Sequence, residues 1–377
     1  MLNEQTLIDY LVRRALVTPA ALLDGDVVIT RTDRRNHNYR VVGATNDLFI
    51  KQGARTGTTG TVAREAATYE LLSLPAMRST LGKYVVQCLD YDAAAGVLIL
   101  EAIARAEDLH AYHTSCGRFP DRVSVELGAA LASLHDATRP LAHPLMDDAP
   151  PRVRPTVFAL GAPDLGILRE ASAVNLKVIR LVQEHHVLTR ELARLAAEWQ
   201  TESLIHGDVK LANCLTYRTH DGGRVCGIKW VDWEFAGLGD PRWDVGSVLS
   251  DYLSLWVFSI PIPRSDEPDR MLDSARFPLS RIQRVFRLFL ASYFRTQSLG
   301  CAEAAAWRLT AIRMAGARLV QTAYEYAAGA NELTAPVLAL LQLAANILER
   351  PDHAQVDLFG ICDDPTAPRR APERRLS

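Results

Sequence analysis

The chain has 377 residues, of which 48% are hydrophobic and 23% are charged, and its formal net charge is −2 at pH 7. This is the composition of a globular protein that is long enough for two domains, and its balanced charge argues against a nucleic-acid binder. The six cysteines are scattered and form no CxxC pair, which predicts reduced thiols in a cytoplasmic protein rather than a zinc site.

The first segment, residues 5–16, has the periodicity of an amphipathic helix and lacks the continuous apolar core of a signal peptide. No apolar run in the sequence approaches the length that spans a membrane. We therefore predict no membrane segment.

The next part of the chain is rich in β-formers. Strands are predicted near 26–31, 38–43 and 47–52, because apolar and β-branched runs alternate there with turn residues. A Gly/Thr loop then covers 53–61, residues 62–74 have a helical period, and "KYVVQCLDYDAAAGVLILEAI" predicts two more strands.

Helical patterns dominate after residue 105. They cover residues 122–138, about 170–199, 279–298, 302–329 and 333–349, and the strand-rich stretch 204–235 interrupts them. The tail, 351–377, is rich in proline and is predicted to be disordered. We thus predict an α+β fold of two lobes, with a β-rich N-lobe over 1–101, a helical C-lobe over 102–350, and a cleft that suits a nucleotide.

The stretch "LIHGDVKLANCLT", residues 204–216, has the features of a catalytic loop between two short strands. Asp208 could accept a proton from an incoming hydroxyl, and Asn213 could direct its amide oxygen at a metal. Lys210 could place a positive charge on a transferring phosphoryl group. Each piece alone is common in ordinary turns, so the prediction depends on their combination and order.

A second polar motif, "WVDWEFAGLGDPRWDVG", spans residues 230–246. Asp232 follows an apolar strand and could supply a carboxylate oxygen. One carboxylate and one amide oxygen are hard ligands of the kind that Mg²⁺ prefers.

These motifs in this order resemble the aminoglycoside phosphotransferase and choline kinase superfamily, which are relatives of the protein kinases, over roughly residues 25–345. The resemblance implies a bilobal kinase-like fold that binds ATP or GTP with Mg²⁺. It also implies that Asp208 is the base, that Asn213 and Asp232 are metal ligands, and that the supporting residues are His206, His135 and Asp244.

In the N-lobe, Lys51 ends an apolar strand, where a charge is costly unless it is paired; alternatively its head reaches solvent. The resemblance implies that Lys51 binds the α- and β-phosphates, with Glu65 as its partner and Glu70 as the alternative. The stretch "VLILEAIARAEDL" is similar to a hinge, where Glu101 and Ile103 would offer backbone groups to adenine.

The first hairpin, "TRTDRRNHNYRV", departs from the kinase pattern because it contains no glycine. A glycine-rich phosphate cover is therefore absent. Arg35, Asn36 and Asn38 could stand in for it, or the loop 53–61 could fold over the nucleotide.

The function of the chain has three interpretations, and in the first two the acceptor is a hydroxyl group. The hairpin resembles the peptide-modifying kinases of class V lanthipeptide and thioamitide biosynthesis, which phosphorylate Ser or Thr before a separate lyase eliminates phosphate. On this interpretation the proline-rich stretch within 140–175 either contacts the peptide or is a plain connector. The alternatives are a small-molecule phosphotransferase of the aminoglycoside or macrolide type and a pseudokinase that only binds its ligands.

Overall fold

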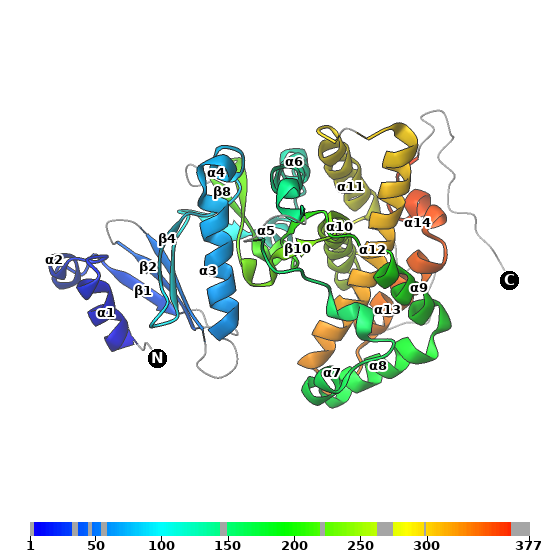
Figure 1. Ribbon diagram of the computed structural model, residues 1–377, viewed down its shortest axis with the longest axis horizontal. Helices are drawn as coiled ribbons and strands as arrows, with labels where there is room; N and C mark the ends of the chain where they lie inside the picture. Colours follow the sequence, from blue (N-terminus) through cyan, green and yellow to red (C-terminus); the bar gives the residue numbers. More distant parts are fainter. Residues whose placement is uncertain are drawn as a thin grey trace. The chain divides into compact units, whose positions relative to one another are not determined.

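The computed structural model describes residues 4–31, 37–43, 47–53, 59–143, 149–218, 223–261, 274–297 and 299–362 (Figure 1). They form two compact units that alternate along the chain. Unit 1 draws on residues 1–112, 206–208 and 212–237, and unit 2 on residues 113–205, 209–211 and 238–377. The segment 212–237, which the sequence assigned to the helical lobe, therefore belongs to the β-rich unit.

Unit 1 is built on a five-stranded antiparallel sheet in the order β1-β2-β3-β5-β4. Its strands are β1 (Val28–Arg31), β2 (His37–Val42), β3 (Leu48–Gln52), β4 (Cys88–Asp92) and β5 (Val97–Glu101). All five lie where alternating β-rich runs predicted them.

The two faces of this sheet differ because successive side chains of a strand point to opposite sides. Tyr39, Ile50 and Ile99 belong to a buried cluster that includes Leu7 and Leu11 of α1 (Glu4–Arg13). Figure 1 shows α1 and α2 (Pro19–Leu23) on one side of the sheet and α3 (Thr59–Ser73) on the other. α4 (Pro75–Leu81) follows α3 directly.

A second, three-stranded sheet in the order β6-β8-β9 completes unit 1. Its strands are β6 (Ala106–Asp108), β8 (Cys214–Arg218) and β9 (Val225–Trp230). In the antiparallel pair, Cys214 at the start of β8 lies opposite Trp230 at the end of β9. Residues just before β8 and just after β9 therefore meet at one edge, and these include Asn213 and Asp232.

From residue 109 onward the chain is mostly helical, with a short two-stranded ribbon of β7 (Ser203–Ile205) and β10 (Gly237–Gly239). The helices are α5 (Leu109–Cys116), α6 (Asp121–Thr138), α7 (Leu165–Glu170), α8 (Ala173–Glu184), α9 (His186–Ala197), α10 (Pro241–Phe258), α11 (Leu279–Phe294), α12 (Cys301–Ala328), α13 (Ala335–Glu349) and α14 (Pro351–Asp357). α10 packs against α11, α12 and α13 and is the most enclosed of them. No helix of the described residues is long and apolar enough to cross a membrane.

The α+β class predicted from the sequence is confirmed, and three local predictions need correction. The single helical stretch predicted at about 170–199 is two helices, α8 and α9, because Ser172 caps the start of α8 and His185 breaks the pattern before α9. α10 was not predicted, because apolar residues all round it hide a helical period. The start of the tail is ordered: α14 forms, and Phe359 is buried against Phe286. Residues 363–377 lie outside the described part.

Candidate active site

The turn His206-Gly207-Asp208 is packed tightly against the segment after β9. Gly207 has φ +79, and a Cβ there would lie 2.5 Å from the Phe235 carbonyl oxygen, so only glycine fits. His206 Nε2 lies 3.0 Å from the Val231 carbonyl oxygen, and its ring lies 4.5 Å from that of Trp233. The turn is thereby fixed to the residue that precedes Asp232.

Asp208 and Asn213 are buried side by side. The Asn213 Nδ2 donates to the Asp208 carbonyl oxygen at 3.0 Å and to its carboxylate at 3.2 Å, and the two residues are 7% and 2% exposed. The Val231 N–H donates to the Asn213 carbonyl at 3.0 Å. Because its NH₂ group is engaged by Asp208, Asn213 presents its amide oxygen, Oδ1, as the remaining ligating atom.

Asp232 adopts a backbone conformation that non-glycine residues rarely take. Its φ of 69 and ψ of 58 lie in the left-handed region, where a non-glycine residue costs about 1–3 kcal/mol. Its side chain is 31% exposed and accepts a hydrogen bond from Lys51 Nζ. The strained turn after β9 thus leaves a carboxylate partly open to solvent.

The predicted ion pair between Lys51 and Glu65 is present. Lys51 Nζ lies 2.6 Å from the Glu65 carboxylate, and the two side chains are 7% and 1% exposed. The alternative partner, Glu70, is exposed on α3. Lys51 is thus not a surface lysine whose charge reaches solvent.

The protonation of this cluster follows from one cation facing two carboxylates. Burial alone would lower the pKa of Lys51, but the Glu65 and Asp232 carboxylates outweigh it and raise that pKa above its usual range. Burial raises the pKa of Glu65 to about 7, against the attraction of Lys51 and with the repulsion of Asp232. When Glu65 is ionised, the cluster holds two negative charges and one positive charge, so it attracts a further cation.

The other predicted nucleotide contacts lie around the same sheet. Asn38 stands directly opposite Lys51 in the β2–β3 pair and so shares its face, and its Oδ1 is buried without a hydrogen-bond partner among the described residues. The Glu101 N–H already donates to the Gln87 carbonyl at 2.9 Å, and the Ile103 carbonyl lies 3.5 Å from an Arg40 nitrogen. Asn36, Arg35 and most of the loop 53–61 lie outside the described residues.

The predicted supporting residues of unit 2, His135 and Asp244, belong to a buried hydrogen-bonded cluster. His135 contacts the Asp244 carboxylate at 3.3 Å and the Tyr293 hydroxyl at 3.0 Å, and both His135 and Asp244 are fully buried. Burial raises the pKa of Tyr293 well above its usual range, so it remains a neutral hydroxyl. Lys210, in the 209–211 segment of the same unit, is partly buried.

One acid that positions the loop after Asp208 was missed from the sequence. Asp251, on α10, accepts a hydrogen bond from the Leu211 N–H at 2.5 Å. It lies seven residues after Asp244, which is two helical turns and hence the same face. That spacing was a usable signal, but it required α10 to be recognised as a helix first.

Comparisons with known proteins bear on the family and the fold of the chain. The profile of the "Phosphotransferase enzyme family" matches residues 28–281. No curated protein matches the chain. Many solved structures also match the chain at low sequence identity, and three of them are described next.

The first is a choline/ethanolamine kinase family protein from Mesorhizobium loti (18% identity, TM-score 0.50, covering 91% of this chain and 96% of that chain). The second is a choline kinase from Streptococcus pneumoniae (16% identity, TM-score 0.50, covering 92% of this chain and 98% of that chain). The third is a choline kinase from Cryptosporidium parvum (12% identity, TM-score 0.53, covering 95% of this chain and 99% of that chain). At these identities the likeness establishes the fold alone.

Proposed function

This chain belongs to the phosphotransferase enzyme family, and from that premise we propose that it transfers the γ-phosphate of a Mg²⁺-bound nucleoside triphosphate to the hydroxyl group of an acceptor. The observation that carries the proposal is the buried Lys51–Glu65 pair joined to Asp232. A buried cation held by two acids is costly as a purely structural device, and it fits a site that binds phosphate and metal.

Asp208 is the proposed base. Asp208 is nearly buried, and the Asn213 amide donates one hydrogen bond to its carboxylate and one to its backbone carbonyl. A carboxylate fixed in this way can accept the proton of an acceptor hydroxyl as the oxygen attacks phosphorus. Lys210 is proposed to stabilise the negative charge of the phosphoryl group during its transfer.

The residues around Asp232 fit magnesium better than a transition metal. No group of three or more His, Cys, Asp or Glu that could hold a metal occurs in the described part of the chain, which disfavours a zinc-type cage. The Asp232 carboxylate and the Asn213 amide oxygen are hard oxygen donors, and Mg²⁺ commonly takes few protein ligands and completes its shell with water and phosphate. Bound there, it would neutralise charge on the phosphates.

Lys51 is the proposed ligand of the α- and β-phosphates, and Asn38 faces the same side of the sheet. Glu101 and Ile103 are the proposed contacts for the base of the nucleotide. Either ATP or GTP fits this description. Asn36 belongs to the same proposal on sequence grounds.

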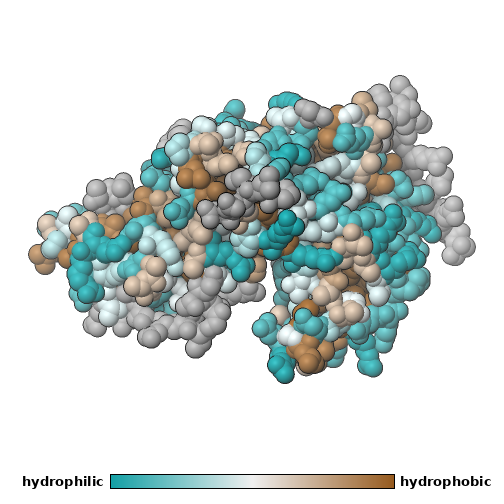
Figure 2. Space-filling model, viewed as in Figure 1, coloured by the Kyte–Doolittle hydropathy of each residue, from teal (hydrophilic) through white to brown (hydrophobic). Residues whose placement is uncertain are grey.

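For the acceptor we favour a Ser or Thr of a ribosomally made peptide, with elimination of phosphate by a separate lyase. The stretch 140–175, which the sequence left as either a peptide contact or a plain connector, includes α7, whose Leu165 and Leu168 are 69% and 38% exposed. Figure 2 shows hydrophobic residues at the lower edge, where α7 lies in Figure 1. Exposed leucines suit an apolar peptide better than a polycationic sugar.

Part of that segment is more than a connector. The Val153 N–H donates to the Leu238 carbonyl at 2.9 Å, and the Leu238 N–H donates to the Pro151 carbonyl at 2.8 Å, so the backbone extends the ribbon that contains β10. This anchoring holds the start of the segment in place. It supports a role in presenting α7 rather than in spanning a gap.

The test is mass spectrometry after incubation with Mg·ATP or Mg·GTP and a panel of acceptors. The panel holds a Ser/Thr peptide encoded beside the gene, choline and an aminoglycoside. Phosphate on the peptide supports the favoured acceptor, and phosphate on choline or the aminoglycoside replaces it with a small-molecule phosphotransferase. Nucleotide binding without transfer to water or to any acceptor would indicate a pseudokinase.

A further inference from the structure

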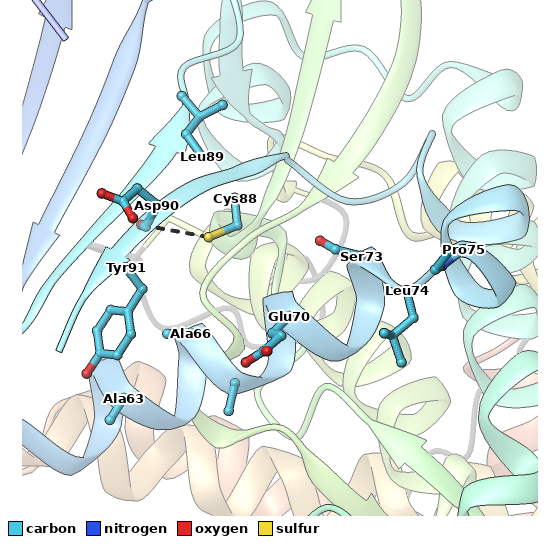
Figure 3. Close-up of a pocket in the computed structure, with 11 residues that line it drawn as sticks. Ala63, Ala66, Glu70, Ser73, Leu74, Pro75, Cys88, Leu89, Asp90 and Tyr91 are labelled. Carbon is cyan, nitrogen blue, oxygen red and sulfur yellow. Dashed lines mark hydrogen bonds between the residues drawn. The ribbon is translucent and has the colours of Figure 1, made fainter. Parts of the chain in front are cut away.

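A groove of about 500 Å³ lies between α3 and β4 in unit 1, on the outer side of the helix that carries Glu65 (Figure 3). The wall formed by α3 carries the small side chains Ala63, Ala66 and Ala67, which leave room for the side chain of a ligand. Tyr91 of β4 lies beside Ala63 and Ala66. The groove is therefore open and largely apolar at this end.

The groove also carries negative charge, and Glu70 lies between Ala66 and Leu74 in Figure 3. Among the described residues that line it, Glu70 and Asp90 are the charged ones, and no Lys, Arg or His is present. Asp90 is paired with Arg14, whereas Glu70 has no hydrogen-bond or ion-pair partner among the described residues. Burial, followed by the charges of Glu65 and then Glu70, raises the pKa of the neighbouring Cys88 thiol to about 11. The groove thus presents one uncompensated carboxylate.

The strand that forms the second wall is suited to binding an extended peptide segment. β4 is an edge strand, so the backbone groups on its outer side are not paired within the sheet. Leu74, at the end of the groove, is 49% exposed, and Figure 2 shows a hydrophobic area over the region where α3 gives way to α4. An extended segment could lie along β4 with its side chains directed at α3.

We propose that this groove binds an extended segment of a partner protein in which a Lys or Arg stands two residues from a bulky apolar side chain. Side chains two apart on a strand are about 6.6 Å apart along its axis. Ala66 and Glu70, one turn apart on α3, are separated by about 6 Å along the helix. The basic side chain then meets Glu70 while the apolar one covers the alanines.

Binding in this groove is coupled to the nucleotide site through α3, and this half of the inference rests on the proposed function. Glu65 lies between the groove-lining Ala63 and Ala66 in the sequence of α3, but it does not line the groove and pairs with Lys51 instead. A rigid helix fixed on its outer side holds Glu65 in place on its inner side. Linkage requires that bound nucleotide strengthen peptide binding by the same factor as the reverse.

The probe is the fluorescein-labelled nonapeptide Gly-Gln-Leu-Gln-Arg-Gln-Leu-Gln-Gly, which has no hydroxyl side chain and so cannot serve as an acceptor. Control peptides replace Arg with Glu, or both Leu with Gln. Fluorescence anisotropy should show binding of the first peptide, at least threefold weaker binding of each control, and a similar loss with Glu70→Gln. Ala67→Arg, at an exposed site, should weaken binding more by filling the groove. Glu349→Gln on α13 is the matched control and should change nothing.

The same titrations are repeated with Mg·ATP, and ATP affinity is measured with and without peptide. We expect each ligand to tighten the other at least twofold, and an unchanged ATP affinity would overturn the coupling. Peptide affinity that is insensitive to both Glu70→Gln and Ala67→Arg would overturn the docking site. A dimer that Ala67→Arg converts to monomers would replace the peptide with a second copy of this chain. Peptide binding with the expected pattern in a protein that binds no nucleotide would leave the groove standing and remove the proposed function.

Discussion

Two of the buried polar clusters in the described part of the chain differ in how completely their groups are satisfied. In unit 2, His135, Asp244 and Tyr293 form a hydrogen-bonded chain in which every member is at most 1% exposed. In unit 1, Lys51 pairs with two carboxylates, those of Glu65 and Asp232. The Asp232 side chain is 31% exposed, and its backbone has a positive φ. A closed cluster can only brace the fold, whereas an open one with excess charge can bind a ligand.

The comparison predicts that the largest functional loss will come from replacing Asp208, the proposed base. Asp208→Asn keeps the size of the side chain but removes the proton acceptor, so turnover should fall by about 10²–10⁴-fold. Nucleotide affinity should stay close to that of the wild type, because this carboxylate is not assigned to the phosphates. Steady-state kinetics and a binding titration on the same preparation check both points. Turnover like that of the wild type would remove Asp208 from the mechanism.

The two clusters should also contribute differently to the free energy of unfolding. Asp244→Ala leaves a buried His135 without its partner and should lower the free energy of unfolding by about 2–4 kcal/mol. Asp232→Ala removes a partly exposed acid from a strained position and should change it by less than about 1 kcal/mol. Urea denaturation of the two variants measures the contrast. Equal losses would mean that the unit 1 cluster is as structural as the unit 2 cluster.

The Lys51–Glu65 pair sharpens the comparison further. Lys51→Ala and Glu65→Gln should each weaken nucleotide binding, and the double variant should be less than additive by about 1–3 kcal/mol because the two changes remove one shared interaction. Glu65→Gln keeps the shape of the buried side chain, which limits unfolding. Glu70→Gln is the matched control on the same helix. Additive losses would show that the observed pair is not the unit that holds the nucleotide.

The smallest expected effect is a pH dependence of stability. The folded-state pKa of Glu65, about 7, is above its ordinary value of 4.5, so the folded protein holds this proton more tightly than the unfolded chain. The contribution is fully present below pH 4.5 and is lost as pH rises to about 7. The stability of the wild type relative to Glu65→Gln should therefore fall across this window, by up to about 3 kcal/mol. Denaturation curves at several pH values check it, and a constant difference would contradict the assignment.

The sequence predicted the parts of the site that depend on local order along the chain. The strand before Lys51, the helical period that buries Glu65, and the strand ends beside Asn213 and Asp232 are all readable from alternation and spacing. The antiparallel register of β8 and β9 then brings the last two together. These are short-range rules that one strand pair converts into three-dimensional proximity.

The sequence did not predict what depends on packing between distant segments. α10 is enclosed by other helices, so it has no polar face, and its Asp251 was overlooked as a consequence. Tyr293 joins His135 across a sequence separation that no spacing rule covers. Phe359 is buried although the residues around it have the composition of a tail. Each miss arises because tertiary contacts, rather than local pattern, fix the element.

The most direct test of the open cluster is calorimetric titration of ATP into the wild type, Asp208→Asn and Asp232→Ala, with Mg²⁺ and with EDTA. Our account predicts that Mg²⁺ strengthens ATP binding to the wild type and to Asp208→Asn, and that this gain is lost in Asp232→Ala. ATP binding that is indifferent to Mg²⁺ in the wild type, or a Mg²⁺ gain that survives in Asp232→Ala, would contradict it.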